Sequence, residues 1–156
     1  MEIIVKKVRT GAEYEGKIAN FWILGQLKDS SCIWIFDSKA YDLRKHINNN
    51  VECLILAFLV NLTQKDYKQD NKESITNIIS GNFIKSALIT SDWKLPWNYK
   101  EKHFAALNTN NGLVLLDWAD LETIPIRENI EIKFQELDEL KLYVQRFDLV
   151  AWHPIE

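Results

Sequence analysis

The amino-acid sequence predicts a mainly β fold in one domain covering residues 1–156. We expect either a barrel or a strongly bent antiparallel sheet, with one or two short helices. Three observations favour this prediction. Of the 156 residues, 47% are apolar and six are tryptophan, so the chain can bury a core without disulfides or a structural metal. Its apolar runs are rich in β-branched and aromatic residues, which favour strands. With only five glycines and three prolines, the sequence contains no segment typical of an interdomain linker.

The first third of the chain consists of runs that favour strands. Residues 3–8 form a short β-rich run, and residues 17–27 and 31–37 are dense in Ile, Phe and Trp. The polar stretch KDSS between the last two runs predicts a hairpin turn. Both of these runs are apolar at odd and even positions alike. We therefore expect them to be covered on both faces or strongly bent.

A short helix is predicted over residues 38–50. Ser38 is a natural N-cap, and three apolar residues recur at the spacing of one helical face, namely Ala40, Leu43 and Ile47. Three consecutive asparagines follow and would end the helix.

The middle of the chain alternates between strand and helix patterns. Ten of the twelve residues from 51 to 62 are apolar, and their β-branched content favours a central buried strand over a second helix. Asp70 and Glu73 have the spacing of a capping box, which predicts a short surface helix over residues 70–81. Residues 83–90 again have strand composition.

Two structures are compatible with residues 96–107. Pro96 favours the first turn of a helix that would run toward Leu107. Alternatively, residues 102–108 form a strand that pairs through the turn TNNG with residues 113–118. We favour the hairpin.

The C-terminal part predicts a hairpin with one irregular strand. Residues 130–135 alternate between apolar and polar side chains, as in a strand with one buried face. The stretch ELDEL would turn the chain back into a strand over residues 140–152. The apolar residues of that strand change from even to odd positions, which predicts a β-bulge near Gln145 and Arg146.

The order strand-strand-strand-helix-strand resembles that of the OB-fold, a five-stranded and partly open Greek-key barrel. An insertion at about residues 63–122 would enlarge it. The resemblance lies in the order of elements. A different β-barrel, or an α+β sheet with two helices on one side, also fits the pattern.

Charge and motifs disfavour several functional classes. The formal net charge is −3, so no strong positive field would attract the protein to phosphate backbones or anionic lipids. The sequence has none of the common phosphate-binding, zinc-protease or serine-hydrolase motifs. Cys32 and Cys53 lie in apolar runs without the spacing of a metal site, and we expect both to be buried hydrophobes. We therefore expect no cofactor and no metal.

The chain lacks the apolar patterns of exported or membrane proteins. The segment MEIIVKKVRT has no signal-peptide core, and the longest apolar run, residues 53–60, is far shorter than the roughly 20 residues of a membrane span. We expect a soluble cytoplasmic protein.

The stretch SDWKLPWNYKEKHFAALN combines aromatic and basic side chains. Such a combination is typical of a protein anchor or of a stacking platform for single-stranded nucleic acid. The alternative is that its tryptophans fold back as a lid over the core, and we favour the lid. The candidate binding residues in this stretch are Trp93, Lys94, Trp97, Tyr99, Lys100, Lys102 and His103.

Three titratable residues are further candidates. His103, with a carboxylate from the acidic turns, could act as a general acid or base. Arg146 and Asp148 lie two apart on the predicted last strand, where regular geometry would point both toward the core. Such a pair is either a structural ion pair or a ligand-orienting arginine, and we favour the structural role.

Taken together, these features favour a binding protein over an enzyme. We expect it to engage another protein through the aromatic loop or an exposed sheet edge. The first alternative is an OB-like module that binds single-stranded nucleic acid through Trp22, Trp34 and Phe36. The second is a small hydrolase or isomerase that uses His103. The sequence does not identify the partner or the oligomeric state.

Overall fold

The computed structural model describes residues 1–59, 75–88, 93, 103–117 and 135–155. This part of the chain is mainly β, as predicted, and its strands form one mixed eight-stranded sheet and one small hairpin. The strands are β1 (Glu2–Thr10), β2 (Glu13–Tyr14), β3 (Lys17–Ile18), β4 (Phe21–Gln26), β5 (Cys32–Asp37), β6 (Asn50–Leu59), β7 (Ile78–Leu88), β8 (His103–Thr109), β9 (Gly112–Asp117) and β10 (Glu139–Pro154).

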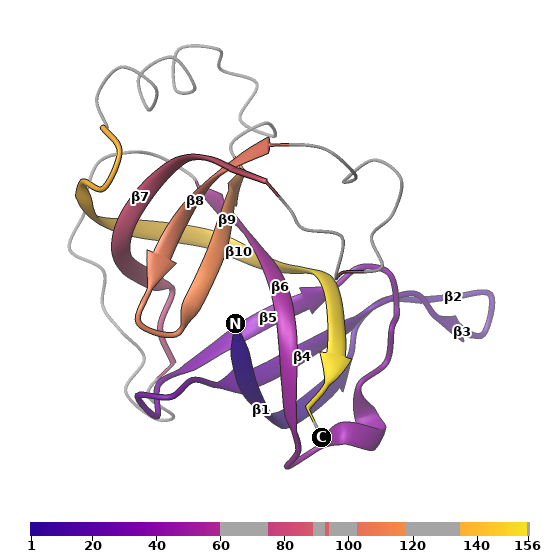
Figure 1. The fold of residues 1–156 in the computed structure, drawn as a ribbon. Coiled ribbons are helices and arrows are strands. Elements are labelled where there is room, and N and C mark those ends of the chain that lie inside the picture. Colours follow the sequence, from indigo (N-terminus) through magenta and orange to yellow (C-terminus); the bar gives the residue numbers. More distant parts are fainter. Residues whose placement is uncertain (60–74, 89–92, 94–102, 118–134, 156) are drawn as a thin grey trace.

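The large sheet curls into a ring. Its strand order is β1-β4-β5-β10-β6-β9-β8-β7, and additional pairings join β1 to β6 and β10 to β7. Figure 1 shows this curvature, with the β2–β3 hairpin projecting away from the sheet.

The first strands follow a Greek-key order. β1, β4 and β5 form an antiparallel meander, and β6 returns to pair with β1 on its other side. β10 then lies between β5, to which it is parallel, and β6, to which it is antiparallel. A second meander, β7–β8–β9, joins the same two strands, because β9 pairs with β6 and β7 pairs with the first part of β10.

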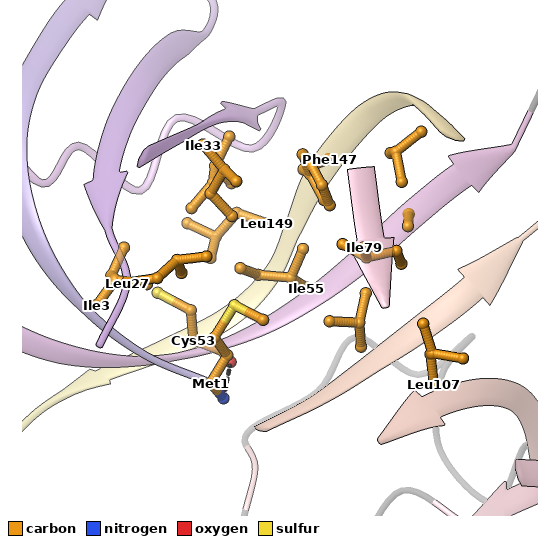
Figure 2. Packing of buried hydrophobic residues seen from close by; sticks show 14 of the residues in the cluster. Met1, Ile3, Leu27, Ile33, Cys53, Ile55, Ile79, Leu107, Phe147 and Leu149 are labelled. Carbon is orange, nitrogen blue, oxygen red and sulfur yellow. Dashed lines mark hydrogen bonds between the residues drawn. The ribbon is translucent and has the colours of Figure 1, made fainter. Parts of the chain in front are cut away.

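The main core fills the inside of the curled sheet. Figure 2 shows Ile33, Ile55, Phe147 and Leu149 pointing into the same interior from β5, β6 and β10. Each of these side chains is at most 3% exposed. Burying one such side chain contributes about 1.5–3 kcal/mol relative to leaving it in water, so this cluster is the main stabilising feature of the fold.

A second apolar cluster lies on the opposite face of the sheet. It consists of Leu54, Leu56, Ala87, Ala106, Leu115, Val150 and Ala151. β6 serves both clusters, because its odd-numbered residues from Val51 to Leu59 pack inside the ring while Leu54 and Leu56 pack outside. This explains its uninterrupted apolar sequence and confirms the prediction of a central buried strand.

The helix predicted over residues 38–50 is wrong. The segment forms an irregular turn with one 3-10 helix, Arg44–His46. Ala40 and Asp42 have positive φ angles of 52° and 63°, which an α-helix does not permit. Ser38 therefore caps no α-helix; the turn is held by Asp37, whose buried carboxylate accepts hydrogen bonds from the N–H groups of Tyr41 and Asp42, both at 3.0 Å.

The predicted helix over residues 70–81 is also wrong where the structure describes it. Residues 78–81 belong to β7, and Ile75 forms an isolated bridge with Cys32. The predicted hairpin that follows is confirmed, since β8 pairs with β9 across the TNNG turn. The predicted strand at residues 130–135 lies outside the described residues except for its last residue. No helix in the described part of the chain has the length and apolar character needed to traverse a bilayer.

Candidate interaction surface

Aromatic side chains gather on the outer face of β4 and β5. Ile23, Ile33 and Ile35 point into the core, so the alternating residues Trp22, Trp34 and Phe36 point outward. Trp22 pairs with Phe36 across the two strands, and the centroids of the two rings lie 4.8 Å apart. All three outward rings are half-buried. These three residues, which the nucleic-acid alternative singles out, thus form an aromatic surface.

Two arginines lie on these rings. Arg9 of β1 pairs with Trp22 in register, and its guanidinium carbon lies 4.8 Å from the centroid of the Trp34 ring. Arg146 of β10 holds its guanidinium carbon 5.1 Å from the Phe36 ring and 4.9 Å from the Phe58 ring. A guanidinium over an aromatic face is attracted by the ring quadrupole, so the rings fix both cations in place.

Asp148 completes this group and orients Arg146. Its carboxylate accepts hydrogen bonds from Nε of Arg146 at 2.6 Å and from Nη2 at 3.0 Å, a bidentate arrangement. The two side chains are 39% and 14% exposed, so the ion pair lies at the surface of the sheet. We call the group of Arg9, Trp22, Trp34, Phe36, Phe58, Arg146 and Asp148 the arginine–aromatic face.

A β-bulge decides that this ion pair faces outward. The register between β10 and β6 shifts between Val144 and Arg146, as the sequence predicted. Val144 therefore packs in the core, whereas Arg146 lies opposite Phe58 on the outer face. The expectation that regular geometry would turn Arg146 and Asp148 toward the core is thus wrong, because the extra residue reverses the alternation of side chains.

Trp93 lies on the outer face and packs there. Its half-buried ring contacts the second apolar cluster, and its centroid lies 4.8 Å from the ring of His153, at an interplanar angle of 36°. It thus covers apolar residues of the sheet, as a lid would. Phe58 packs against the same cluster, so this cluster joins Trp93 to the arginine–aromatic face.

Most other candidates in the aromatic stretch are not placed. Lys94, Trp97, Tyr99, Lys100 and Lys102 lie outside the described residues. The backbone of His103 begins β8 and pairs with Leu88, but its side chain is likewise outside the description. The proposed roles of these residues therefore remain predictions.

The second part of β1 forms one edge of the large sheet in its described part. Residues 7–10 pair only with β4 there and include Lys7 and Arg9, and Lys6 lies in the register shift just before them. Charged residues at an edge discourage the addition of another strand. Arg9 also adds positive charge beside the aromatic rings.

The described residues contain no metal-binding cluster, and both cysteines are buried. Among the described residues, no group of three His, Cys, Asp or Glu side chains could hold a metal ion. Both cysteines are buried and free, and burial raises the pKa of the Cys53 thiol to about 12, so it is not a ready nucleophile. The cleft of about 370 Å³ between the β4–β5 and β8–β9 turns is lined by neither histidine nor cysteine.

Sequence reasoning missed two members of the arginine–aromatic face, Arg9 and Phe58. The position of Arg9 depends on a second register shift, between Val5 and Lys7, which a single sequence does not reveal. Phe58 lies in a run that is apolar throughout, where alternation gives no signal. No protein-family model matches this chain, and no significantly similar curated protein or solved structure was found.

Proposed function

We propose that this chain is a binding domain for a protein partner and that the arginine–aromatic face is its recognition surface. The observation that carries the proposal is the placement of two guanidinium groups on aromatic rings at the outer face of β5. Tryptophan and arginine are enriched among the residues that dominate protein interfaces. Here the rings and Asp148 hold the arginines before any partner binds, which lowers the entropy lost on association.

Two features favour protein over nucleic acid. Stacking of bases requires accessible ring faces, but Arg9 lies over one face of Trp34, and Arg146 lies over Phe36 and Phe58. In addition, Asp148 places a carboxylate within the face and the net charge of the chain is −3, so a polyanion gains little from long-range attraction.

A single-stranded nucleic acid is the second candidate, favoured by the strand order. The Greek-key ring of β1, β4, β5, β6 and β10 supports our proposal of an OB-like barrel in which β7–β9 are an insertion before the last strand. In that comparison β4 and β5 take the places of the second and third strands, whose face binds oligonucleotides in OB-folds. Trp22, Trp34 and Phe36 lie on this face.

Affinity capture from a lysate of the native organism, followed by mass spectrometry, tests the proposal. The wild-type chain would be compared with Arg9→Ala/Trp34→Ala and with the control Lys17→Ala, which changes an exposed residue of the separate β2–β3 hairpin. We expect a protein that the wild type and the control retain and the double variant loses. Melting temperatures within a few degrees of wild type would show that the variants are folded. If the captured proteins are the same for all three chains, the proposal is wrong.

A further inference from the structure

A group of polar side chains lies where β8, β7 and β10 run side by side. Asn82 of β7 pairs in register with Asn108 of β8 and with Glu139 of β10, so these three side chains point to the same face of the sheet. Neighbouring strands are about 4.8 Å apart, and the three side chains therefore form a row across the sheet. Ser80 and Lys141 pair in register and add a second row on this face.

The five residues of these two rows line a cleft of about 440 Å³, together with Gly81, Asn110 and Leu140. We call it the asparagine cleft. Ser80, Asn110 and Lys141 also line the cleft between the β4–β5 and β8–β9 turns, so the two clefts adjoin. The asparagine cleft shares no residue with the arginine–aromatic face.

The lining of the asparagine cleft is suited to hydroxyl groups. The amide of asparagine carries both an acceptor and donors, as a hydroxyl does, so amides and hydroxyls can pair in either direction. Three of the eight lining residues are asparagines, and Ser80 adds a hydroxyl. Glu139 and Lys141 carry opposite charges and are the charged residues of the lining, so their formal charges cancel. A ligand rich in hydroxyls and without net charge matches this lining.

The same cleft has little to offer a nucleobase or a peptide. Among the described residues that line it, none is aromatic, so a base has no ring to stack on. Peptides that bind to sheets depend on pockets for alternate side chains. Leu140 is the one large apolar residue of the lining, and it packs against the main core. The observations therefore favour a carbohydrate.

Hydrogen bonds hold the cleft in shape before a ligand binds. Nδ2 of Asn82 donates to the carbonyl of Leu137 at 3.0 Å, which orients the amide and leaves its Oδ1 as an acceptor for a ligand. The N–H of Phe83 donates to the carbonyl of Asp138 at 2.8 Å, and the N–H of Leu137 donates to the carbonyl of Phe83 at 2.7 Å. These bonds tie the start of β10 to β7, so less order is lost on binding.

From these observations we infer that the asparagine cleft binds a neutral carbohydrate. The amides of Asn82 and Asn108 and the carboxylate of Glu139 form hydrogen bonds with its hydroxyls. The inference goes beyond the proposed function, because it concerns a different ligand at a different surface.

A glycan array tests the inference first. The biotinylated chain is bound to fluorescent streptavidin, which raises the avidity for weakly bound sugars, and is applied to immobilised neutral, sialylated and sulfated oligosaccharides. We expect neutral oligosaccharides to be retained in preference to the anionic ones. The best retained neutral oligosaccharide is then titrated into the ¹⁵N-labelled protein, and the side-chain amide signals of Asn82, Asn108 and Asn110 should shift. The neutral peptide SGNSGN, at the same concentration, should shift them less.

Protein variants assign the binding to the cleft. Asn108→Ala should weaken binding of the oligosaccharide about fivefold, and Glu139→Ala about tenfold, because a charged acceptor forms the stronger hydrogen bond. Both side chains are exposed, so the variants should melt within a few degrees of wild type. The matched control is Asn49→Ala, which changes an exposed asparagine in the turn before β6, outside the cleft, and should bind as the wild type does.

Several results would overturn the inference: retention of no glycan, preference for sialylated or sulfated glycans, equal or larger shifts with the peptide, or unchanged affinity in both cleft variants. Because Arg9→Ala/Trp34→Ala leaves the asparagine cleft intact, it should retain the oligosaccharide. Its loss of a captured protein therefore tests the proposed function separately.

Discussion

Replacement of Asp37 by alanine should destabilise the protein strongly. Asp37 ends β5 and is fully buried, the one charged side chain in the core of the described residues. Its two carboxylate oxygens accept the N–H groups of Tyr41 and Asp42, one each, at 3.0 Å. In Asp37→Ala both donors lose their acceptor within a partly buried turn. The turn that leads from β5 toward β6 then loses the contact that fixes its irregular backbone.

The magnitude follows from the two hydrogen bonds. A hydrogen bond to a charged group contributes about 1.5–3 kcal/mol, so losing both costs about 3–6 kcal/mol if water does not replace the carboxylate. This is a large fraction of a typical unfolding free energy of about 5–15 kcal/mol. Asp37→Asn keeps one acceptor oxygen and should cost about half as much.

Urea unfolding followed by tryptophan fluorescence measures this loss. The matched control is Ser38→Ala, which removes the exposed side chain that the sequence suggested as a helix cap, and its effect should stay within about 0.5 kcal/mol. If Ser38→Ala costs as much as Asp37→Ala, or if Asp37→Ala unfolds at the wild-type urea concentration, the role of the Asp37 carboxylate in holding this turn is refuted.

Three further predictions follow from single residues. Burial raises the pKa of the Cys53 thiol to about 12, so this thiol should not react with a disulfide reagent in the native protein at pH 8. It should react once urea unfolds the chain, and rapid labelling of the native protein would contradict its burial. Gly81→Ala should lower the unfolding free energy by about 1–3 kcal/mol, because a Cβ there overlaps the backbone carbonyl of Asn108; an unchanged urea midpoint would show that β7 and β8 are not so close. The hydrogen bond from Arg44 lowers the pKa of Asp42 below 3.8, so the folded state binds fewer protons than the unfolded state in acid. The stability that this ionised pair contributes is therefore complete above about pH 5 and is lost as the pH falls through the folded pKa. Asp42→Asn should therefore lessen the loss of stability in acid, measured as urea midpoints from neutral to low pH, and an unchanged pH profile would count against this pair.

The fold could be predicted where the deciding interactions are local. Side-chain alternation has a period of two, so the change of parity near Gln145 revealed the bulge in β10 without any knowledge of its neighbours. The apolar run of β6 indicated a strand covered on both faces, and both faces of β6 are indeed covered. The turn TNNG indicated the β8–β9 hairpin by its composition alone.

The helix prediction for the segment after β5 was wrong because contacts distant in sequence determine its structure. Apolar residues at helical spacing suggested a helix, but only Leu43 is buried in the core, whereas Ile47 is 41% exposed. The backbone follows the carboxylate of Asp37, and the hydroxyl of Tyr41 donates a hydrogen bond to the carbonyl of Val150 in β10. A tertiary contact across 109 positions thus overrides a local propensity.

The candidate surface was predictable only in part. Matching parity placed Trp22, Trp34 and Phe36 on one face, but strands that are apolar on both sides do not show which side meets the core. The tertiary structure determines which side is covered: among the described residues, the second apolar cluster consists of residues from β6 to β10 and includes none from β4 or β5. The outward rings of β4 and β5 are instead accompanied by Arg9 and Arg146.

The bulge in β10 links the core to this surface. Before the bulge Val144 points inward, and after it Phe147 and Leu149 point inward, so the strand buries apolar side chains on both sides of the irregularity. The inserted residue leaves Arg146 and Asp148 as the outward pair between them. Without it, the same apolar register would drive both charges toward the core, where an ion pair loses its hydration. The irregularity that keeps the core apolar is therefore also what places a fixed guanidinium beside Phe36.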